Sequence, residues 1–473
     1  MKQTILGGAD GARLIARQGR QRSVLFVSAG LLQPKKRDHP LARRQLYLNY
    51  GALGLATLCE VNGLDTLMVH GEHEHPLALV QRLYQQGRIS ADTQVLLSIP
   101  SFYALQWSRL FCEAVKRADR GARIVVGGRW VTGPDKAWLE GLLPHADLIV
   151  QGVGEPLLSE LLDFQGRWQA PADCGLNHRL VEGYARYQPS IETSRGCGRG
   201  CAFCEERAIP LEDLKAPALI VKELQRIIAD YGDQTVRPYF QSSYLVPKRR
   251  WAEQLAEQVQ RAGIDVAWRC ESRVDSVKPN AVAALAAAGM KVIDLGLESA
   301  SLQQLRHMNK APEPKRYLDA ASELLETCAS HGIWVKLNVL LYAGETARTL
   351  DETRRWLDAH AQYFKGLSVG PVVVYGPNSH CADFLQELRV LGASPVDPAS
   401  AQAGGVTQMH LSAELSSEQA ELESLALSRR YMTQSDYFDL KCFSYYPRDY
   451  SQAQFERDVA ACDASRLPFR MPA

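Results

Sequence analysis

The sequence lacks an excess of charge of either sign, a long hydrophobic run and an amino-terminal leader pattern. Its 473 residues include 54 Lys and Arg against 53 Asp and Glu, which gives a net charge of +1. That balance creates no global field that would recruit nucleic acid or an anionic membrane. No apolar run is long enough to span a bilayer, and residues 1–22 contain no apolar core of the signal-peptide kind. We therefore predict a cytoplasmic protein with neither a membrane nor a nucleic-acid partner.

Cysteine is scattered singly everywhere except in one short run. Eight of the 11 cysteines have no neighbour at metal-ligand spacing, so we expect no second iron–sulfur cluster. Reduced, buried thiols in a reducing compartment are the expectation for these positions. They are Cys59, Cys112, Cys174, Cys270, Cys328, Cys381, Cys442 and Cys462.

The remaining three cysteines, Cys197, Cys201 and Cys204, lie within eight residues of one another. Thiolates suit iron–sulfur centres, and three of them hold three irons of a cubane four-iron–four-sulfur cluster. The fourth iron is then open to a small molecule. A structural zinc site usually takes four ligands in two separated pairs, and no second pair follows. A zinc site and three buried thiols remain the alternatives. Phe203, between the last two cysteines, offers an aromatic face to a bound base.

The first third of the chain alternates apolar strands with amphipathic helices, which predicts a parallel sheet covered on both faces. Predicted strands cover residues 23–28, 65–69, 94–98, 122–126 and 147–150. Ligands of such α/β sheets bind at the carboxyl ends of the strands. Small residues that permit close backbone approach lie at these ends: Gly30, Ser98, Gly127, Gly128, Gly152 and Gly154.

The pattern after a Pro- and Gly-containing linker, residues 166–190, indicates a partial barrel. Six strand–helix units are expected, with strands at residues 191–194, 238–242, 266–270, 292–297, 335–341 and 367–375. We predict an α/β protein with four segments: a Rossmann-like doubly wound domain (1–165), the linker (166–190), the partial (β/α)6 barrel (191–376) and a carboxyl-terminal extension (377–473). The aromatic run at residues 437–450 either caps the barrel mouth or packs against the barrel side.

The spacing C-x3-C-x2-C at residues 197–204, after a β-prone stretch, resembles the signature of the radical SAM superfamily. The resemblance implies that the open iron binds the amino and carboxylate groups of S-adenosylmethionine. Reductive cleavage then gives a 5′-deoxyadenosyl radical. It also implies an external one-electron donor such as flavodoxin or ferredoxin. The six predicted strand–helix units match the partial barrel of that family.

Residues 20–165 resemble the cobalamin-binding domain that precedes many radical SAM domains. The resemblance depends on Val-Val-Gly-Gly at residues 125–128 and on Gln-Gly-Val-Gly-Glu-Pro at 151–156. It implies cobalamin as a further cofactor, held at Ser98, Gly127, Gly128, Gly152 and Gly154. No Asp-x-His-x-x-Gly occurs, so no histidine is expected to ligate cobalt from below. A Rossmann-like domain that no longer binds cobalamin is the alternative.

The barrel strands end in segments that also resemble the family. Gly-Leu-Glu-Ser at residues 296–299 implies that Glu298, with Ser299 beside it, hydrogen-bonds the adenosyl cofactor; a helix cap is the alternative. Asn338 begins a segment similar to the family's Gly-x-Pro-Gly-Glu-Thr turn, although Tyr342 and Ala343 replace its usual small-residue–Pro pair. Arg273 ends the third strand, where its planar fork suits the methionyl carboxylate or a surface ion pair.

These resemblances imply a radical SAM enzyme that acts on a small molecule. The leading interpretation is cobalamin-dependent radical methylation of an unactivated carbon in a specialised biosynthetic pathway. The alternative is cobalamin-independent dehydration, rearrangement or cyclisation of a polyol or aminoglycoside-like natural-product intermediate. Ser242 and Ser243 stand where relatives often carry two aspartates, which keeps this alternative open.

Overall fold

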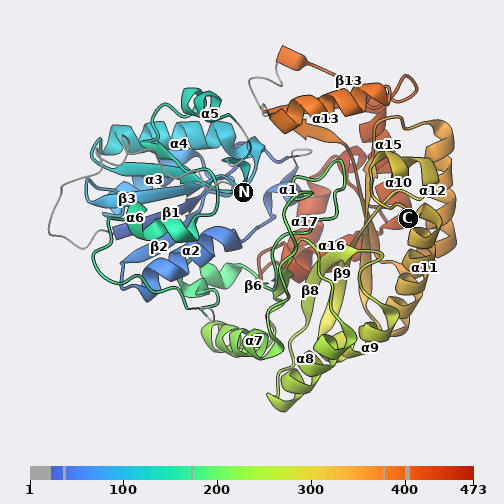
Figure 1. Ribbon diagram of the computed structural model, residues 1–473, viewed down its shortest axis with the longest axis horizontal. Helices are drawn as coiled ribbons and strands as arrows, with labels where there is room; N and C mark the ends of the chain where they lie inside the picture. The colour runs from blue at the N-terminus through green and yellow to red at the C-terminus, as the bar shows by residue number, and fades with distance from the viewer. Residues whose placement is uncertain are drawn as a thin grey trace.

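The apolar segments of the first third form a five-stranded parallel sheet. The computed structural model describes residues 23–35, 39–131, 133, 135–171, 174–376, 379–399 and 405–472. The strand order of this sheet is β2-β1-β3-β4-β5 (Figure 1). Its strands are β1 (Ser23–Ser28), β2 (Thr66–His70), β3 (Thr93–Ser98), β4 (Arg123–Gly127) and β5 (Leu148–Ile149).

Alternation along each strand explains why helices cover both faces of this sheet. In β1, Leu25 and Val27 belong to one hydrophobic core, while Val24 and Phe26 belong to another on the opposite face. The first core includes residues of α3 (Pro76–Gln85), α4 (Leu105–Ala118) and α5 (Lys136–Leu142), and the second includes residues of α2 (Tyr50–Val61) and α6 (Leu158–Leu161). The predicted Rossmann-like arrangement is confirmed.

The second sheet has six parallel strands in sequential order, β6 to β11, and curves into a partial barrel (Figure 1). The strands are β6 (Ser190–Glu192), β7 (Tyr239–Gln241), β8 (Trp268–Arg273), β9 (Met290–Glu298), β10 (Trp334–Leu341) and β11 (Gly366–Pro371). The helices on its outside are α7 (Pro217–Tyr231), α8 (Arg249–Arg261), α9 (Pro279–Ala287), α10 (Leu302–His307), α11 (Pro314–Ser330) and α12 (Ala347–His360).

The prediction of one strand over residues 367–375 is wrong. β11 ends at Pro371, and β12 (Val373–Tyr375) joins a different, antiparallel sheet with β13 (Ser394–Pro395) and β14 (Val406–His410). Proline has no N–H to give to a ladder, so Pro371 is a natural end for a barrel strand. Beyond it the chain leaves the barrel, and α13 (Ser379–Val390) connects β12 to β13.

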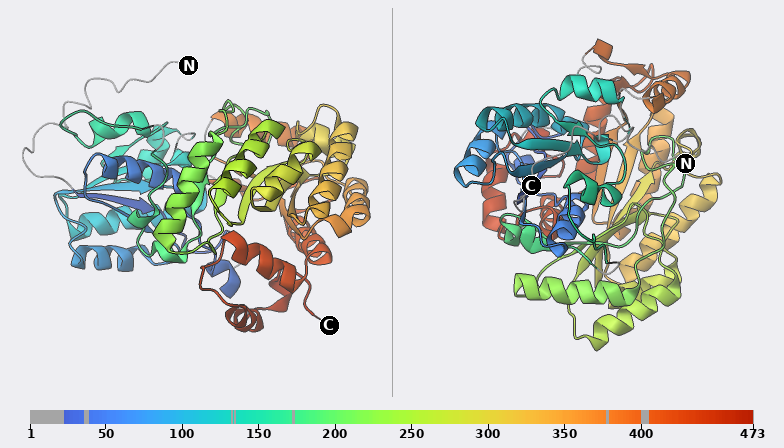
Figure 2. Two further views of the ribbon diagram at one scale, coloured as in Figure 1. Left: turned by 90° about the horizontal axis from the view of Figure 1, so that it is seen from below. Right: turned by 60° about the vertical axis from the view of Figure 1, so that its left-hand side comes forward.

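The carboxyl-terminal helices close the space between the two sheets. α15 (Ser417–Tyr431) packs along β11, and α16 (Gln434–Ser444) and α17 (Gln452–Ala460) follow it. The amino-terminal segment joins this group, because α1 (Pro40–Arg43) contacts α17 and the Leu46 N–H donates to the Tyr445 carbonyl at 2.7 Å (Figure 2). Residues 39–49, which we call the strap, therefore tie the first domain to the end of the chain.

The predicted linker is ordered in its described part. Val181 forms a parallel bridge with Met68 at the edge of the first sheet, and the buried His178 accepts a hydrogen bond from the Ser190 N–H at 3.0 Å. The path of the chain from one sheet to the other is thus set by packing. No helix among the described residues is long and apolar enough to cross a membrane.

Candidate active site between the two sheets

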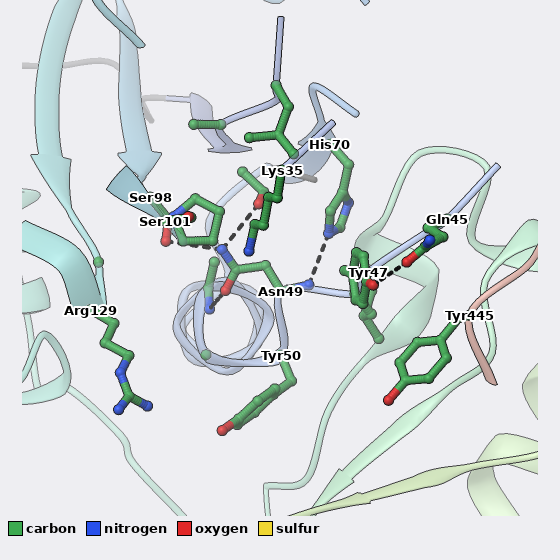
Figure 3. Close-up of a pocket in the computed structure, with 18 of the residues that line it drawn as sticks. Lys35, Gln45, Tyr47, Asn49, Tyr50, His70, Ser98, Ser101, Arg129 and Tyr445 are labelled. Atoms are coloured by element: carbon green, nitrogen blue, oxygen red, sulfur yellow. Dashed lines mark hydrogen bonds between the residues drawn. The ribbon is translucent and has the colours of Figure 1, made fainter. Parts of the chain in front are cut away.

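A cavity of about 1070 Å³ lies between the two sheets. Residues that follow the first-sheet strands form one wall, and the cysteine loop, the barrel interior and α15–α16 form the others. Figure 3 shows side chains that converge on it from the strap, from the first sheet and from the carboxyl-terminal helices. The strand ends predicted to bind a ligand therefore share one space with the barrel.

The cysteine loop follows β6 and doubles back tightly. Gly196 has φ of +74°, and a Cβ there would lie 2.0 Å from the Pro210 carbonyl oxygen, so only glycine fits. The Cys197 N–H donates to the Ile209 carbonyl at 3.0 Å, and the Ala202 N–H donates to the Met308 carbonyl at 2.8 Å. The first bond closes the loop on itself, and the second holds it against the segment that follows α10 of the barrel.

The three thiols of this loop are close enough to influence one another's pKa values. Among the described residues, no three His, Cys, Asp or Glu side chains are grouped closely enough to hold a single metal ion. A structural zinc site gathers four ligands on one ion, whereas each thiolate of a cubane cluster binds a different iron. Burial raises the pKa of Cys204 to about 11 and also raises that of Cys197. A stable thiolate form therefore needs nearby positive charge, which an iron–sulfur cluster supplies.

Arg273, at the end of β8, lies directly behind the loop. Its Nη1 donates to Cys201 Sγ at 3.2 Å, and its Nε and Nη2 bind Asp275 at 2.9 and 3.1 Å. Nη2 also donates to the Lys310 carbonyl at 2.6 Å. Four of the five guanidinium N–H groups are thus engaged, which leaves one for the predicted methionyl carboxylate.

The other barrel residues named from the sequence lie in two different environments. Glu298 has a positive φ of +64° and accepts a hydrogen bond from Lys310 Nζ at 2.8 Å. Ser299 is buried, with its hydroxyl bonded to Thr353 and to the Ser301 N–H; the N-cap of α10 is Ser301, so Ser299 does not cap this helix. Asn338 accepts from Lys336 Nζ inside the barrel. The roles of these residues in cofactor binding stay predictions.

Phe203 lies between the cysteine loop and the barrel. Its ring centroid is 6.4 Å from that of Tyr342, and Lys310 Nζ is 5.8 Å from the Phe203 centroid. Phe203 is only partly buried, so one part of its surface stays free. Contact with a base is still a prediction.

The first-sheet residues named from the sequence all line the cavity, but their glycines serve different purposes. At Gly128, a Cβ would lie 2.7 Å from the Ile99 nitrogen, so glycine is needed there by the fold itself. At Gly127 the nearest atom to an added Cβ is the Val150 oxygen at 3.8 Å, and at Gly152 nothing lies within 4 Å. Gly154 meets only the Leu55 side chain. Open space above Gly127 and Gly152 fits the approach of a large flat ligand.

Asn49 organises the polar floor of this wall. Its Nδ2 donates to Ser28 Oγ and Ser98 Oγ at 3.1 and 3.0 Å, and its N–H donates to His70 Nε2 at 3.0 Å (Figure 3). Burial lowers the pKa of His70 to about 4, so its imidazole is neutral at physiological pH. Asn49 was not predicted from the sequence. Its local signal is that of an N-cap, because its Oδ1 accepts a hydrogen bond from the Ala52 N–H at 3.1 Å at the start of α2.

Two ion pairs connect the cysteine loop to the first domain. Arg129 bonds Glu206, and Arg195 bonds Glu155 at 2.7 Å while also holding Glu192. Both cavity walls are therefore joined at the loop that carries the cysteines.

The aromatic run of the carboxyl-terminal extension divides between the two predicted alternatives. Tyr437 and Tyr445 line the cavity. The rings of Tyr446, Tyr450 and Phe455 instead pack in a separate core that includes Leu41 of the strap and Tyr437 itself.

Comparison with known proteins identifies the barrel. The radical SAM superfamily model matches residues 191–357. A protein of Pyrococcus horikoshii named as an uncharacterized methyltransferase is 23% identical over 294 residues, which is 54% of this chain and 61% of the relative. The chain thus spans about three fifths of that relative's length.

Solved structures share the fold at low identity. The radical S-adenosylmethionine methyltransferase TsrM from Kitasatospora setae, with cobalamin and a [4Fe-4S] cluster bound, matches with a TM-score of 0.59 and 15% identity over 96% of this chain and 93% of TsrM. The cobalamin-dependent radical enzyme OxsB, with aqua-cobalamin and S-adenosylmethionine bound, matches with a TM-score of 0.55 and 14% identity over 78% of this chain and 55% of OxsB. A radical SAM domain implies a [4Fe–4S] cluster and S-adenosylmethionine, and the three free thiols of its loop fit that cluster. The chain therefore contains a radical SAM domain at residues 191–357, which follows a domain of Rossmann-like fold.

Proposed function

We propose that this enzyme methylates an unactivated carbon of a small molecule and uses cobalamin as its second cofactor. The observation that carries the proposal is the cavity of about 1070 Å³, which has the glycine-containing strand ends on one wall and the cysteine loop on the other. The TsrM match supports it, because it extends over nearly the whole of both chains. So does the name methyltransferase carried by the Pyrococcus horikoshii relative.

The chain's own residues fit the two cofactors at separate places. Cys197, Cys201 and Cys204 would hold the cluster, and Glu298 would bind the adenosyl cofactor near Lys310. Gly127 and Gly152 leave the space that a corrinoid ring needs, and Asn49, Ser98 and His70 form the polar floor beneath it. When bound, cobalamin supplies the methyl group.

The remaining side chains would position the substrate and exclude water. Enclosure by α15, α16 and the strap limits solvent access to the cavity, which favours reactions of short-lived radicals. An external one-electron donor, a flavodoxin or ferredoxin, is part of the proposal. Dehydration or rearrangement without cobalamin is the competing function.

Gly127→Phe tests the proposal directly. The added ring would project from the end of β4 into the cavity without a backbone clash, since an added Cβ meets nothing closer than 3.8 Å. We expect the variant to lose hydroxocobalamin binding, followed by its visible spectrum, while it keeps its iron and its cleavage of S-adenosylmethionine. Gly141→Phe is the matched control, because Gly141 lies on the exposed side of α5 with no atom within 4 Å of an added Cβ.

The competing function makes the opposite prediction. If the wild-type protein binds no corrinoid and still turns over substrate, the methyltransferase proposal fails. Cobalt content and deoxyadenosine formation, measured on the same anaerobically reconstituted sample, separate the two functions.

A further inference from the structure

Three charged residues form a row across neighbouring barrel strands. Glu271 of β8 pairs in register with Asp294 of β9, and Asp294 pairs with Lys336 of β10. Residues in register on adjacent strands point to the same face of a sheet and are separated by about 4.8 Å per strand. The row therefore lies side by side on the inner face of the barrel, where Lys336 lines the cavity.

The central member of the row is fully satisfied. Arg269 binds both oxygens of Asp294 at 2.5 and 2.7 Å, and Lys336 Nζ donates to it at 3.0 Å. Arg269 is completely buried and also donates to the Leu440 carbonyl at 2.7 Å. These two cations hold the pKa of Asp294 well below its usual range. The Tyr239 hydroxyl adds a long contact at 3.5 Å, so Asp294 is a structural anion whose acceptor sites are taken by protein groups.

Glu271 differs from Asp294 although it stands next to it. Protein groups of the barrel interior surround its carboxylate, which nevertheless stays accessible to solvent there. Among the described residues, this carboxylate accepts one long hydrogen bond, from the Tyr239 hydroxyl at 3.4 Å. An ionised carboxylate is an acceptor with about four lone-pair sites. Most acceptor sites of the Glu271 carboxylate therefore have no hydrogen-bond donor among the described protein groups. These sites can accept hydrogen bonds from water or from a bound molecule.

Flat aromatic groups line the part of the cavity beside Arg269 and Lys336, the cations nearest to Glu271, and Tyr445 interacts electrostatically with Glu271 itself. Tyr47, Tyr437 and Tyr445 line the cavity together with Leu440 and Met432. The rings of Tyr47 and Tyr445 have centroids 5.4 Å apart (Figure 3). The Arg269 guanidinium lies 4.5 Å from the Tyr445 centroid. Aromatic surfaces of this kind bind planar apolar groups.

We propose that Glu271 binds the substrate, and that the substrate carries an ammonium or other N–H donor on a flat apolar body. The N–H group would donate to Glu271, while the body lies against Tyr47 and Tyr445. This inference deepens the proposed function by naming the substrate class, and it relies on that function only for the location of the substrate.

The pH dependence of binding follows from the surroundings of Glu271. Burial and the neighbouring Asp294 raise its pKa to about 7. The other titratable and charged groups that face it are Tyr50, Tyr239, Arg269, Asp294, Lys336 and Tyr445. Burial raises the pKa of Tyr50 to about 12. Burial keeps the pKa values of Tyr239 and Tyr445 far above neutrality, and the cations keep that of Asp294 far below it. Glu271 is therefore the member of this group that changes charge near neutral pH.

Two probes of equal length and opposite charge test the proposal. 3-Phenylpropylamine and 3-phenylpropionate are titrated against the cluster-loaded full chain without reductant, and binding is followed by ligand-observed NMR. We expect the amine to bind at least about tenfold more tightly than the acid, and Glu271→Gln to weaken the amine by about tenfold or more, as for one charge-assisted hydrogen bond. Binding of the amine should strengthen from about pH 6 to pH 8 as Glu271 ionises, and this trend should vanish in the variant.

The controls separate this result from misfolding and from failure of the proposed function. Glu257→Gln, on the exposed surface of α8, should leave binding of both probes unchanged. Iron content, corrinoid binding and thermal unfolding are measured on Glu271→Gln. Tighter binding of the acid, equal binding of the amine to wild type and Glu271→Gln, or no binding of either probe would overturn the inference. Any of these results in a protein that still binds corrinoid and cleaves S-adenosylmethionine would leave the methyltransferase proposal standing.

Discussion

Arg273 should set the reduction potential of the cluster as well as anchor the loop. The guanidinium is 6% exposed and donates to Cys201 Sγ at 3.2 Å, so replacement by Met removes a charged donor from a thiolate that water reaches poorly. Hydrogen bonds to the sulfur ligands stabilise the reduced, more negative cluster, and their loss lowers the potential. Arg273→Met should therefore make the cluster harder to reduce.

The size of the shift follows from the contact. A hydrogen bond to a charged group is worth about 1.5–3 kcal/mol. In a one-electron couple about 1.4 kcal/mol corresponds to about 59 mV. If the lost hydrogen bond stabilises mainly the reduced cluster, the reduction potential should fall by roughly 60–130 mV in the variant. Arg273→Lys, which keeps the charge but loses the fork, should shift it by a smaller amount in the same direction.

The assay is a potentiometric titration of the reconstituted protein, followed by EPR of the reduced cluster. Arg199→Met is the control, because Arg199 lies in the same loop but bonds the Tyr244 hydroxyl instead of a cysteine. Arg273→Met also leaves Asp275 without its partner, so iron content and thermal unfolding must be checked. If it does not hold a cluster, Arg273→Lys carries the measurement. An unchanged potential in an iron-loaded variant would refute the reasoning.

Two further predictions concern the remaining cofactor residues. Replacement of Cys197, Cys201 or Cys204 by Ala should abolish cluster absorbance and cleavage of S-adenosylmethionine; a triple variant that still holds about four irons per chain would disprove the ligand assignment. Glu298→Gln should weaken S-adenosylmethionine binding by about tenfold or more, measured by equilibrium dialysis, with iron content unchanged. Equal affinity would remove Glu298 from the binding site.

The elements that could be predicted from the sequence are those whose partners lie nearby in the chain. Alternating apolar strands and amphipathic helices give both sheets to within a few residues, because burial on two faces leaves a strong local pattern. The strap was not predicted, since the burial of Leu41 depends on helices about 400 residues later. The split at Pro371 had a local signal that the surrounding apolar run obscured.

The site residues also divide into those with a local sequence signal and those without one. The cysteine spacing is a local signal and predicts its chemistry by itself. The row of Glu271, Asp294 and Lys336 arises only when separate strands come into register, so no single motif contains it. The contacts of Asn49 likewise need the ends of three strands to meet. One signal was present: in β10, Lys336 and Asn338 alternate with buried Val335, Leu337 and Val339. Polar residues on the inner face of a barrel strand indicate a cavity in place of a packed interior.

Packing, more than charge, holds the two cofactor walls together. The exposed fractions are 48% for Arg129 and 44% for Arg195, and pairs this exposed typically contribute about 0–1 kcal/mol each. Full burial of the Leu41 side chain of the strap is worth about 1.5–3 kcal/mol, and Leu41 is joined there by aromatic rings from three later segments. The strap and the carboxyl-terminal helices thus fix the spacing of the walls. The ion pairs, which begin at Arg129 after β4 and at Arg195 in the cysteine loop, orient that loop toward the first sheet. A substrate held at Glu271 would then lie inside walls whose separation does not depend on salt.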